Sequence, residues 1–178
     1  MIRYIAFLRG INVSGSRLIK MENLRALFEE LKFKNVKTYI QSGNVLFDAK
    51  ETDDAALNKK IEKHLHKSLG FEVTVITRSL AEITEVIKQN PFPKVEINED
   101  VQLYVSFLPE IPDSKQTALL LAASNEYEKF VIIKSAVYCL CSKKADGTRL
   151  FSNTLVEKKL KLAATTRNWA TVNKILTL

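Results

Sequence analysis

The order in which strand-type and helix-type hydrophobic patterns follow one another constrains the fold of this chain most. Within the first 78 residues, the runs that favour strands are residues 2–8, 36–40, 45–47 and 73–76. Apolar side chains recur at helical spacing over residues 21–32 and again over 57–69. The resulting order, βαββαβ, is that of a ferredoxin-like half-domain.

A second set of patterns begins at residue 79. Ser79 and Glu82 have capping-box spacing at the start of a third helix, which the prolines of Asn90-Pro91-Phe92-Pro93 must end. Thr154 and Glu157 show the same capping-box spacing further on. Between these helices, strand-type runs occur at residues 101–108, 129–134 and 136–141, and one helix-type run occurs at 114–123. Together with the helix that follows them, these runs repeat the βαββα order.

We therefore predict an α+β fold of two ferredoxin-like (βαββαβ-type) half-domains with a C-terminal helical segment. The expected divisions are a ferredoxin-like half-domain at 1–78, a helix and linker at 79–99, and a second α+β half-domain with C-terminal helices at 100–178. Trp169 begins an apolar stripe on the terminal helix. The expected N-cap of this helix is Thr165 or Thr166. This assignment places Arg167 in the first helical turn and Trp169 in the core.

Composition favours a soluble cytoplasmic protein. The sequence contains no run of about 18 apolar residues and does not open on a signal-peptide pattern. Its two cysteines, Cys139 and Cys141, alternate on one expected strand, where they share a face but lie too far apart to form a comfortable disulfide. Reduced core thiols are therefore expected, with no metal site, no cofactor and no membrane contact.

The net charge of +7 is distributed unevenly. Residues 1–78 carry 14 basic and 9 acidic side chains, residues 79–142 carry 5 and 9, and residues 143–178 carry 8 and 2. If the two basic segments converge in space, the molecule would have a positive face. Such a face would attract phosphates, nucleic acid or an acidic partner. The alternative is that the lysines are dispersed over solvated helices.

The loop that follows the first strand is the candidate anion site. Leu8-Arg9-Gly10-Ile11-Asn12-Val13-Ser14-Gly15 is rich in hydrogen-bond donors, Arg17 and Lys20 follow it, and a helix N-terminus lies behind it. The first and second strands run in parallel in a ferredoxin-like order, so this loop should meet the turn that contains Gln41, Ser42 and Asn44. Alternatively, the glycines only make turns and the asparagines bond to nearby backbone.

No catalytic set is evident in the sequence. His64 and His66 lie on the second predicted helix. Residues two apart on a helix point to opposite faces, so these histidines cannot share a metal ion. Ser42 has no visible general base. Whether the protein is an enzyme is left open by the residues.

Three segments resemble motifs of the bacterial domain-of-unknown-function 1697 family. They are Leu8-Arg9-Gly10-Ile11-Asn12-Val13, Tyr39-Ile40-Gln41-Ser42-Gly43-Asn44-Val45-Leu46-Phe47 and Ala164-Thr165-Thr166-Arg167-Asn168-Trp169, and Asn90-Pro91-Phe92-Pro93 is similar to a fourth. The resemblance implies a soluble bacterial protein with α+β halves and no established activity. This chain has Ser14 and Lys161 where the family often has glycine, and Ala170 where it often has asparagine. Lys161 makes a sharp helix end at that point unexpected.

Three functional hypotheses follow. The first is binding of a phosphate-bearing or other anionic ligand, a small molecule or exposed nucleic-acid backbone, by Arg9, Asn12, Arg17, Lys20, Gln41, Ser42, Asn44 and Arg167. The second is an enzyme that acts on a small anionic substrate in a cleft between the halves. The third is a structural or protein-interaction role. Nucleic-acid binding is expected to be weak and nonspecific, and the oligomeric state is left undetermined.

Overall fold

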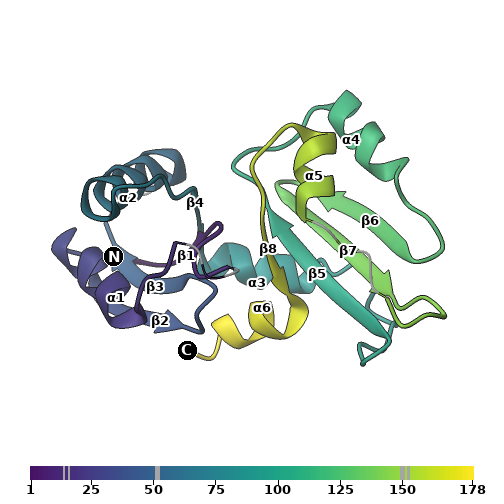
Figure 1. Cartoon of the computed structure of the whole chain (residues 1–178), viewed down its shortest axis with the longest axis horizontal. Coiled ribbons are helices and arrows are strands. Elements are labelled where there is room, and N and C mark those ends of the chain that lie inside the picture. The colour runs from purple at the N-terminus through teal and green to yellow at the C-terminus, as the bar shows by residue number, and fades with distance from the viewer. Residues whose placement is uncertain (14, 16, 51–52, 149–150, 152) are drawn as a thin grey trace. The chain divides into compact units, whose positions relative to one another are not determined.

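The structure is a computed structural model that describes residues 1–178 except 14, 16, 51–52, 149–150 and 152. The chain divides into two compact units, Met1–Glu82 and Ile83–Leu178, which are described separately (Figure 1). None of the helices in the described part of the chain combines the length and the hydropathy needed to cross a membrane.

The first unit is a four-stranded antiparallel sheet with two helices. Its elements are β1 (Ile2–Leu8), α1 (Met21–Glu30), β2 (Lys34–Tyr39), β3 (Asn44–Ala49), α2 (Asp54–Leu69) and β4 (Val75–Ser79). The strand order is β2-β3-β1-β4, and β1 pairs with both β3 and β4 in antiparallel register. This arrangement agrees with the predicted α+β class and has the ferredoxin-like order.

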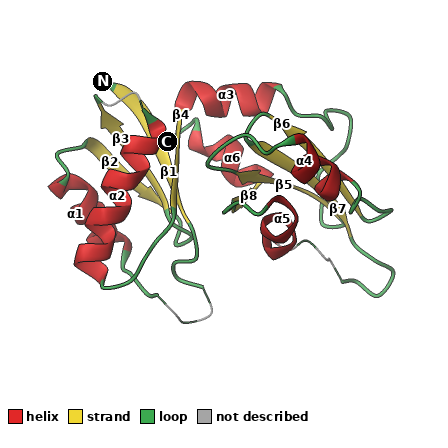
Figure 2. Cartoon of the chain, turned by 90° about the horizontal axis from the view of Figure 1, so that it is seen from above, coloured by secondary structure: helices red, strands yellow, loops and turns green. Residues whose placement is uncertain are grey.

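The core of the first unit lies between its sheet and its two helices. Leu24 and Phe28 of α1 and Leu57, Ile61 and Leu65 of α2 are fully buried against the sheet. Figure 2 shows α1 and α2 side by side on that face. The helical spacing read from the sequence therefore corresponds to the buried stripes. Asp53 begins α2 by accepting hydrogen bonds from two backbone amides, and Gly70 ends it in a left-handed conformation.

The second unit repeats this strand order. Its elements are β5 (Val101–Phe107), α4 (Ser114–Leu121), β6 (Glu128–Ile133), β7 (Ala136–Ser142), α5 (Asn153–Leu160), β8 (Thr165–Asn168) and α6 (Trp169–Ile175), and the sheet order is β6-β7-β5-β8. Helices α4 and α5 supply Leu120, Val156 and Leu160 to a core on one face of the sheet. The two units thus share one topology.

Helix α3 (Leu80–Lys88) contains the division between the units. Its predicted capping box is confirmed, because the Ser79 amide donates to Glu82 and the Glu82 amide donates to the Ser79 hydroxyl. The third helix therefore begins where the sequence indicated.

Three expectations for the C-terminal region were wrong. Thr154 lies inside α5 rather than at its cap, and the Glu157 carboxylate accepts from the Ala164 amide. Residues 165–168 form β8 instead of a helix start, because they complete the sheet beside β5. The cap of α6 is Asn168, whose side chain accepts from the Thr171 amide. Trp169 is half-buried rather than in the core.

Candidate functional site

The loop after β1 is held by the side chain of Asn12. Its amide group donates to the carbonyl oxygens of Ile19 at 3.1 Å and Gln41 at 3.0 Å, and its oxygen accepts from the Ile19 amide at 2.8 Å. The bond to Gln41 joins this loop to the turn between β2 and β3. The two segments therefore meet, as parallel β1 and β2 require, and Asn12 acts as the link between them.

The turn itself packs closely on the loop. The Leu8 amide donates to the Gly43 carbonyl at 2.8 Å, and a Cβ at Gly43 would lie within 2.9 Å of Ile11 and Leu8 side-chain atoms. Gly43 also has a φ of +77°. The side-chain amide of the buried Asn44 donates to the Tyr39 carbonyl and the Ser42 hydroxyl, both at 3.0 Å. Glycine is thus required by close approach as well as by conformation.

Ile40 is strained beside this turn. Its φ is +49°, a left-handed conformation that is unfavourable for a β-branched side chain, and its side chain is 47% exposed. Such outliers persist where the surrounding contacts hold them, and they concentrate at functional positions. Here the contacts of Asn12 and Asn44 on either side of Ile40 supply that restraint.

A hollow of about 660 Å³ lies between the loop and the start of α1. It is lined by Asn12, Leu18, Ile19, Lys20, Met21, Glu22, Asn23, Gln41 and Leu69. Among the residues that the structure describes, no side chain caps α1, and Lys20 occupies the N-cap position. Uncapped backbone amides at a helix start favour the binding of a negatively charged group. The carboxylate of Glu22 in the first turn would repel such a group.

The other predicted cations are placed differently. Arg9 is half-buried, and its backbone amide donates to Thr74. Arg17 is exposed with its guanidinium carbon 5.7 Å from the centre of the Phe71 ring, a cation–π contact. Neither residue lines the hollow. The departure at Ser14 falls outside the described residues.

Arg167 is a buried strand residue of the second unit, which corrects its expected place in a helix. Its guanidinium donates to the Thr166 carbonyl at 2.8 Å and the Thr165 hydroxyl at 3.3 Å, and burial lowers the pKa of Arg167 to about 10. Arg78 of β4 occupies the equivalent position, donating to the Thr77 carbonyl at 2.7 Å. Each unit therefore buries one arginine on its fourth strand.

The environment of Arg78 was not foreseen from the sequence. Burial lowers the pKa of Arg78, whereas the carboxylates of Glu82 and Asp54 oppose that change. In turn, burial and the nearby Glu82 raise the pKa of Asp54. The signal in the sequence was the repeat itself, Thr-Arg followed by a capping residue, at positions 77–79 and 166–168.

A second basic hollow was also missed. It has a volume of about 330 Å³, and its lining includes Lys32, Lys34, Lys50 and Lys60 together with Asp48. Asp48 is neutralised by Arg3 at 3.1 Å and also accepts from Asn35. Lys32 follows α1, Lys34 begins β2, Lys50 follows β3 and Lys60 lies on α2. These segments meet at the end of the sheet opposite to the loop, so the topology rather than any motif gathers the lysines.

Comparison with known proteins finds a matching family model and a solved structure of similar fold. A family model described as "Protein of unknown function (DUF1697)" matches residues 1–138. A solved structure, conserved bacterial protein SP0830 from Streptococcus pneumoniae, is similar with a TM-score of 0.72 and 24% identity, over 98% of this chain and 96% of that chain. This similarity shows the fold. No curated protein matches the chain.

Proposed function

The chain belongs to the DUF1697 family of proteins of unknown function, and we propose from its own geometry that it binds a phosphate-bearing or other anionic ligand. The binding site would be the hollow between the loop after β1 and the start of α1. The observation that carries this proposal is that the hollow is lined by the cationic Lys20 and by the first turn of a helix without a side-chain cap.

The polar residues would divide into two roles. Lys20, the exposed Gln41 side chain and the first amides of α1 would contact the ligand. Asn12 and Asn44 are positioning residues, because their amide groups already bond to the backbone. Ser42 accepts from Asn44 and supports the same turn. The strain at Ile40 is consistent with a turn that is held in a conformation suited to binding.

The remaining arginines would contribute at longer range. Arg9 and Arg17 lie on the loop but outside the hollow, so they would raise the local positive potential rather than contact the ligand. We leave Arg167 out of the proposed site, because its guanidinium already donates to the Thr165 hydroxyl and the Thr166 carbonyl. The opposing carboxylate of Glu22 would limit affinity.

Titration of the ¹⁵N-labelled protein with inorganic phosphate tests the proposal. We expect chemical-shift changes at the amides of Met21, Glu22 and Asn23. Lys20→Ala should weaken binding several-fold, and Glu22→Gln should strengthen it by about two- to fivefold, because a nearby charge at a surface site contributes about 1 kcal/mol.

Lys59→Ala is the matched control, because Lys59 is an exposed lysine on α2 that lines a different hollow. It should leave phosphate affinity unchanged. Equal losses in Lys20→Ala and Lys59→Ala would show diffuse electrostatics instead of a site. Unchanged affinity in both Lys20→Ala and Glu22→Gln would favour the structural role for the loop and turn.

A further inference from the structure

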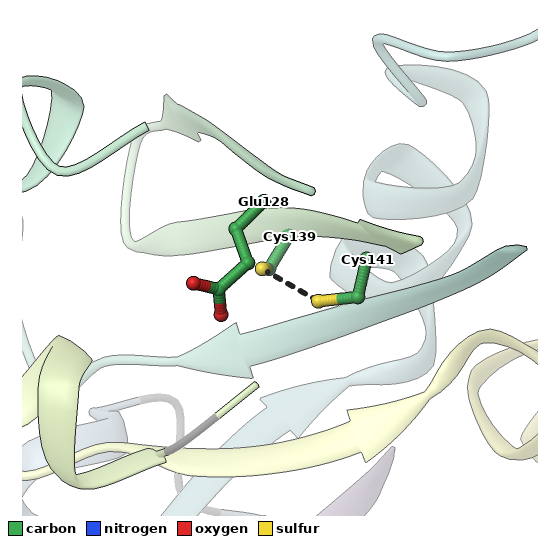
Figure 3. Close-up of side chains that lie close together, drawn as sticks. All are labelled: Glu128, Cys139 and Cys141. Carbon is green, nitrogen blue, oxygen red and sulfur yellow. Dashed lines mark hydrogen bonds between the residues drawn. The ribbon is translucent and has the colours of Figure 1, made fainter. Parts of the chain in front are cut away.

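Three side chains that can bind a cation lie together inside the second unit. Cys139 and Cys141 alternate along β7, and Glu128 of β6 is paired with Cys141 across the ladder. Figure 3 shows the Glu128 carboxylate and both sulfur atoms close together. One oxygen or sulfur atom from each residue lies within 4.8 Å of the others, and all three residues are buried.

The Glu128 carboxylate is poorly satisfied by hydrogen bonds. Its residue is 5% exposed, and within the described part of the chain its Oε1 atom has no hydrogen-bond partner. The Oε2 atom is reached only at 3.5 Å by the Asn125 amide group. A buried carboxylate with so few donors is unfavourable unless a cation or another group compensates it.

The thiols do not provide that compensation. Their sulfur atoms are 3.2 Å apart, and both cysteines are free. Neither thiol carries a positive charge, so the unfavourable burial of the Glu128 carboxylate is left for a cation to relieve.

We propose that Glu128, Cys139 and Cys141 bind one divalent metal ion of the zinc type inside the second unit. Thiolates favour borderline and soft ions, and Zn²⁺ also accepts a carboxylate oxygen as a ligand. As the two metal–sulfur bonds form, each thiol releases its proton to solvent and no electron is transferred. With two thiolates and one carboxylate as ligands, a site that holds a divalent ion has a net charge of −1. The same site with monovalent copper would have a net charge of −2, and a buried site tolerates the larger charge less well.

The distance between the two sulfur atoms is compatible with this coordination. Zinc–sulfur bonds of about 2.3 Å in a tetrahedral site would hold the two sulfur atoms about 3.8 Å apart. This separation is greater than the observed 3.2 Å by roughly half an ångström, which small side-chain rotations would supply. Three protein ligands leave one position of a tetrahedral ion for a further ligand.

The site would join β6 to β7 and would be filled as the unit folds. All three ligands are buried, so an ion can enter during folding or through local opening of the structure. An ion that binds the folded state alone raises its stability. The proposed role is therefore structural, and it does not depend on the anion site of the first unit.

Refolding in the presence of Co²⁺ tests the proposal with a spectroscopic probe. The full chain is unfolded in denaturant under reducing conditions, freed of metal, and refolded with increasing Co²⁺. We expect a sulfur-to-cobalt charge-transfer band that saturates at one ion per chain and disappears when Zn²⁺ is added. Cys139 and Cys141 are the two cysteines of the sequence, so the band would report on them. A folded, reduced chain without this band would overturn the proposal.

Glu128→Gln tests the carboxylate ligand while preserving its shape. It should weaken Co²⁺ binding at least about tenfold, since even the loss of an indirect partner of a metal ligand reduces affinity by 10- to 100-fold. Glu126→Gln, at an exposed position in the same segment, is the matched control and should bind like the unaltered protein. Equal affinity in the two variants would show that Glu128 is not a ligand. In that case the three-residue site would be rejected.

Discussion

At the scale of single residues, the ends of elements depend on unusual backbone conformations. Helix α5 ends at Leu160, and Lys161 follows with a φ of +53° while its amide donates to the Glu157 carbonyl. The family often has glycine at this position, so the sequence made a sharp helix end unexpected. The helix nevertheless ends there, because the chain must turn toward β8, and lysine takes the left-handed conformation with some strain.

Lys161→Gly should therefore stabilise the protein by about 1 kcal/mol, because glycine adopts a left-handed conformation without the Cβ penalty. Chemical denaturation measures the change. Lys158→Gly is the control, at an exposed position within α5. It should instead destabilise by about 1 kcal/mol, the usual loss for glycine inside a helix. Destabilisation by both substitutions would contradict the strain assigned to Lys161.

A second residue-scale prediction concerns Tyr138. Its hydroxyl donates to the Val86 carbonyl at 2.7 Å, and burial raises the pKa of Tyr138 to about 12. Between pH 10 and 12 the unfolded chain loses this proton while the folded chain keeps it, so this group's contribution to stability falls as pH rises. The lowered pKa of Arg167, about 10, acts in the opposite direction over this range.

Comparison with Tyr138→Phe isolates the tyrosine. At neutral pH the variant should lose about 1 kcal/mol with the hydrogen bond to Val86. Its stability should then fall less steeply than that of the unaltered protein between pH 10 and 12. Parallel stability curves for the two proteins, measured by denaturation at each pH, would argue against the raised pKa.

At the scale of elements, the outer edge of β4 is covered by side chains of α2. The Asn58 oxygen accepts from the Thr77 amide at 2.9 Å, and the Glu62 carboxylate accepts from the Val75 amide at 2.8 Å. These two helical residues, four apart, lie on one face of α2 and match two alternate amides of the strand. They satisfy an edge that would otherwise offer free amides to another chain.

Glu62→Ala should destabilise the first unit by about 1–2 kcal/mol, because the Val75 amide loses a charged acceptor. Hydrogen exchange at Val75 should become faster, as NMR can measure. Glu62→Gln keeps an acceptor and should recover most of the loss. Lys63→Ala, at an exposed neighbouring position, should leave exchange at Val75 unchanged. Slow exchange at Val75 in Glu62→Ala would mean that another group protects the strand.

Strand β8 shows the limit of patterns at this scale. Its four residues are too few to establish a period, and the apolar stripe that begins at Trp169 made the whole segment look helical. Pairing of Val105 with Arg167 and of Phe107 with Thr165 makes it a strand. The half-buried position of Trp169 follows, because the helix begins at the end of that strand.

At the scale of the whole molecule, the two units repeat one strand order and one buried arginine, yet their charges differ along the chain. The net charge of +7 comes from basic segments on both sides of an acidic middle. In the first unit, the folded chain has a loop hollow and a separate lysine hollow. We therefore expect nucleic acid to meet dispersed positive charge rather than a surface that reads bases.

Binding of a labelled oligonucleotide should accordingly be weak and should fall more than tenfold between about 50 and 200 mM salt, because phosphate contacts release condensed counterions. Fluorescence anisotropy at several salt concentrations measures the slope. Oligonucleotides of different sequence should bind equally. Sequence-selective binding that is insensitive to salt would instead indicate contacts to base edges.

The sequence by itself determined the type and order of most elements, because hydrophobic periods and capping residues are local properties of the chain. It also indicated that the loop with Asn12 would meet the turn with Gln41, since that follows from parallel β1 and β2. The role of this loop and this turn in binding an anion stays a proposal.

Only the tertiary structure decided how the polar groups are used. Asn12 bonds to backbone, Arg167 is buried in a strand, and Glu128 lies beside Cys141 through the pairing of β6 with β7. These outcomes depend on which strand lies next to which and in what register. The alternation within a strand and the adjoining turn constrain the register. Which strands become neighbours depends on contacts between segments distant in sequence, and the pattern of one segment does not show these.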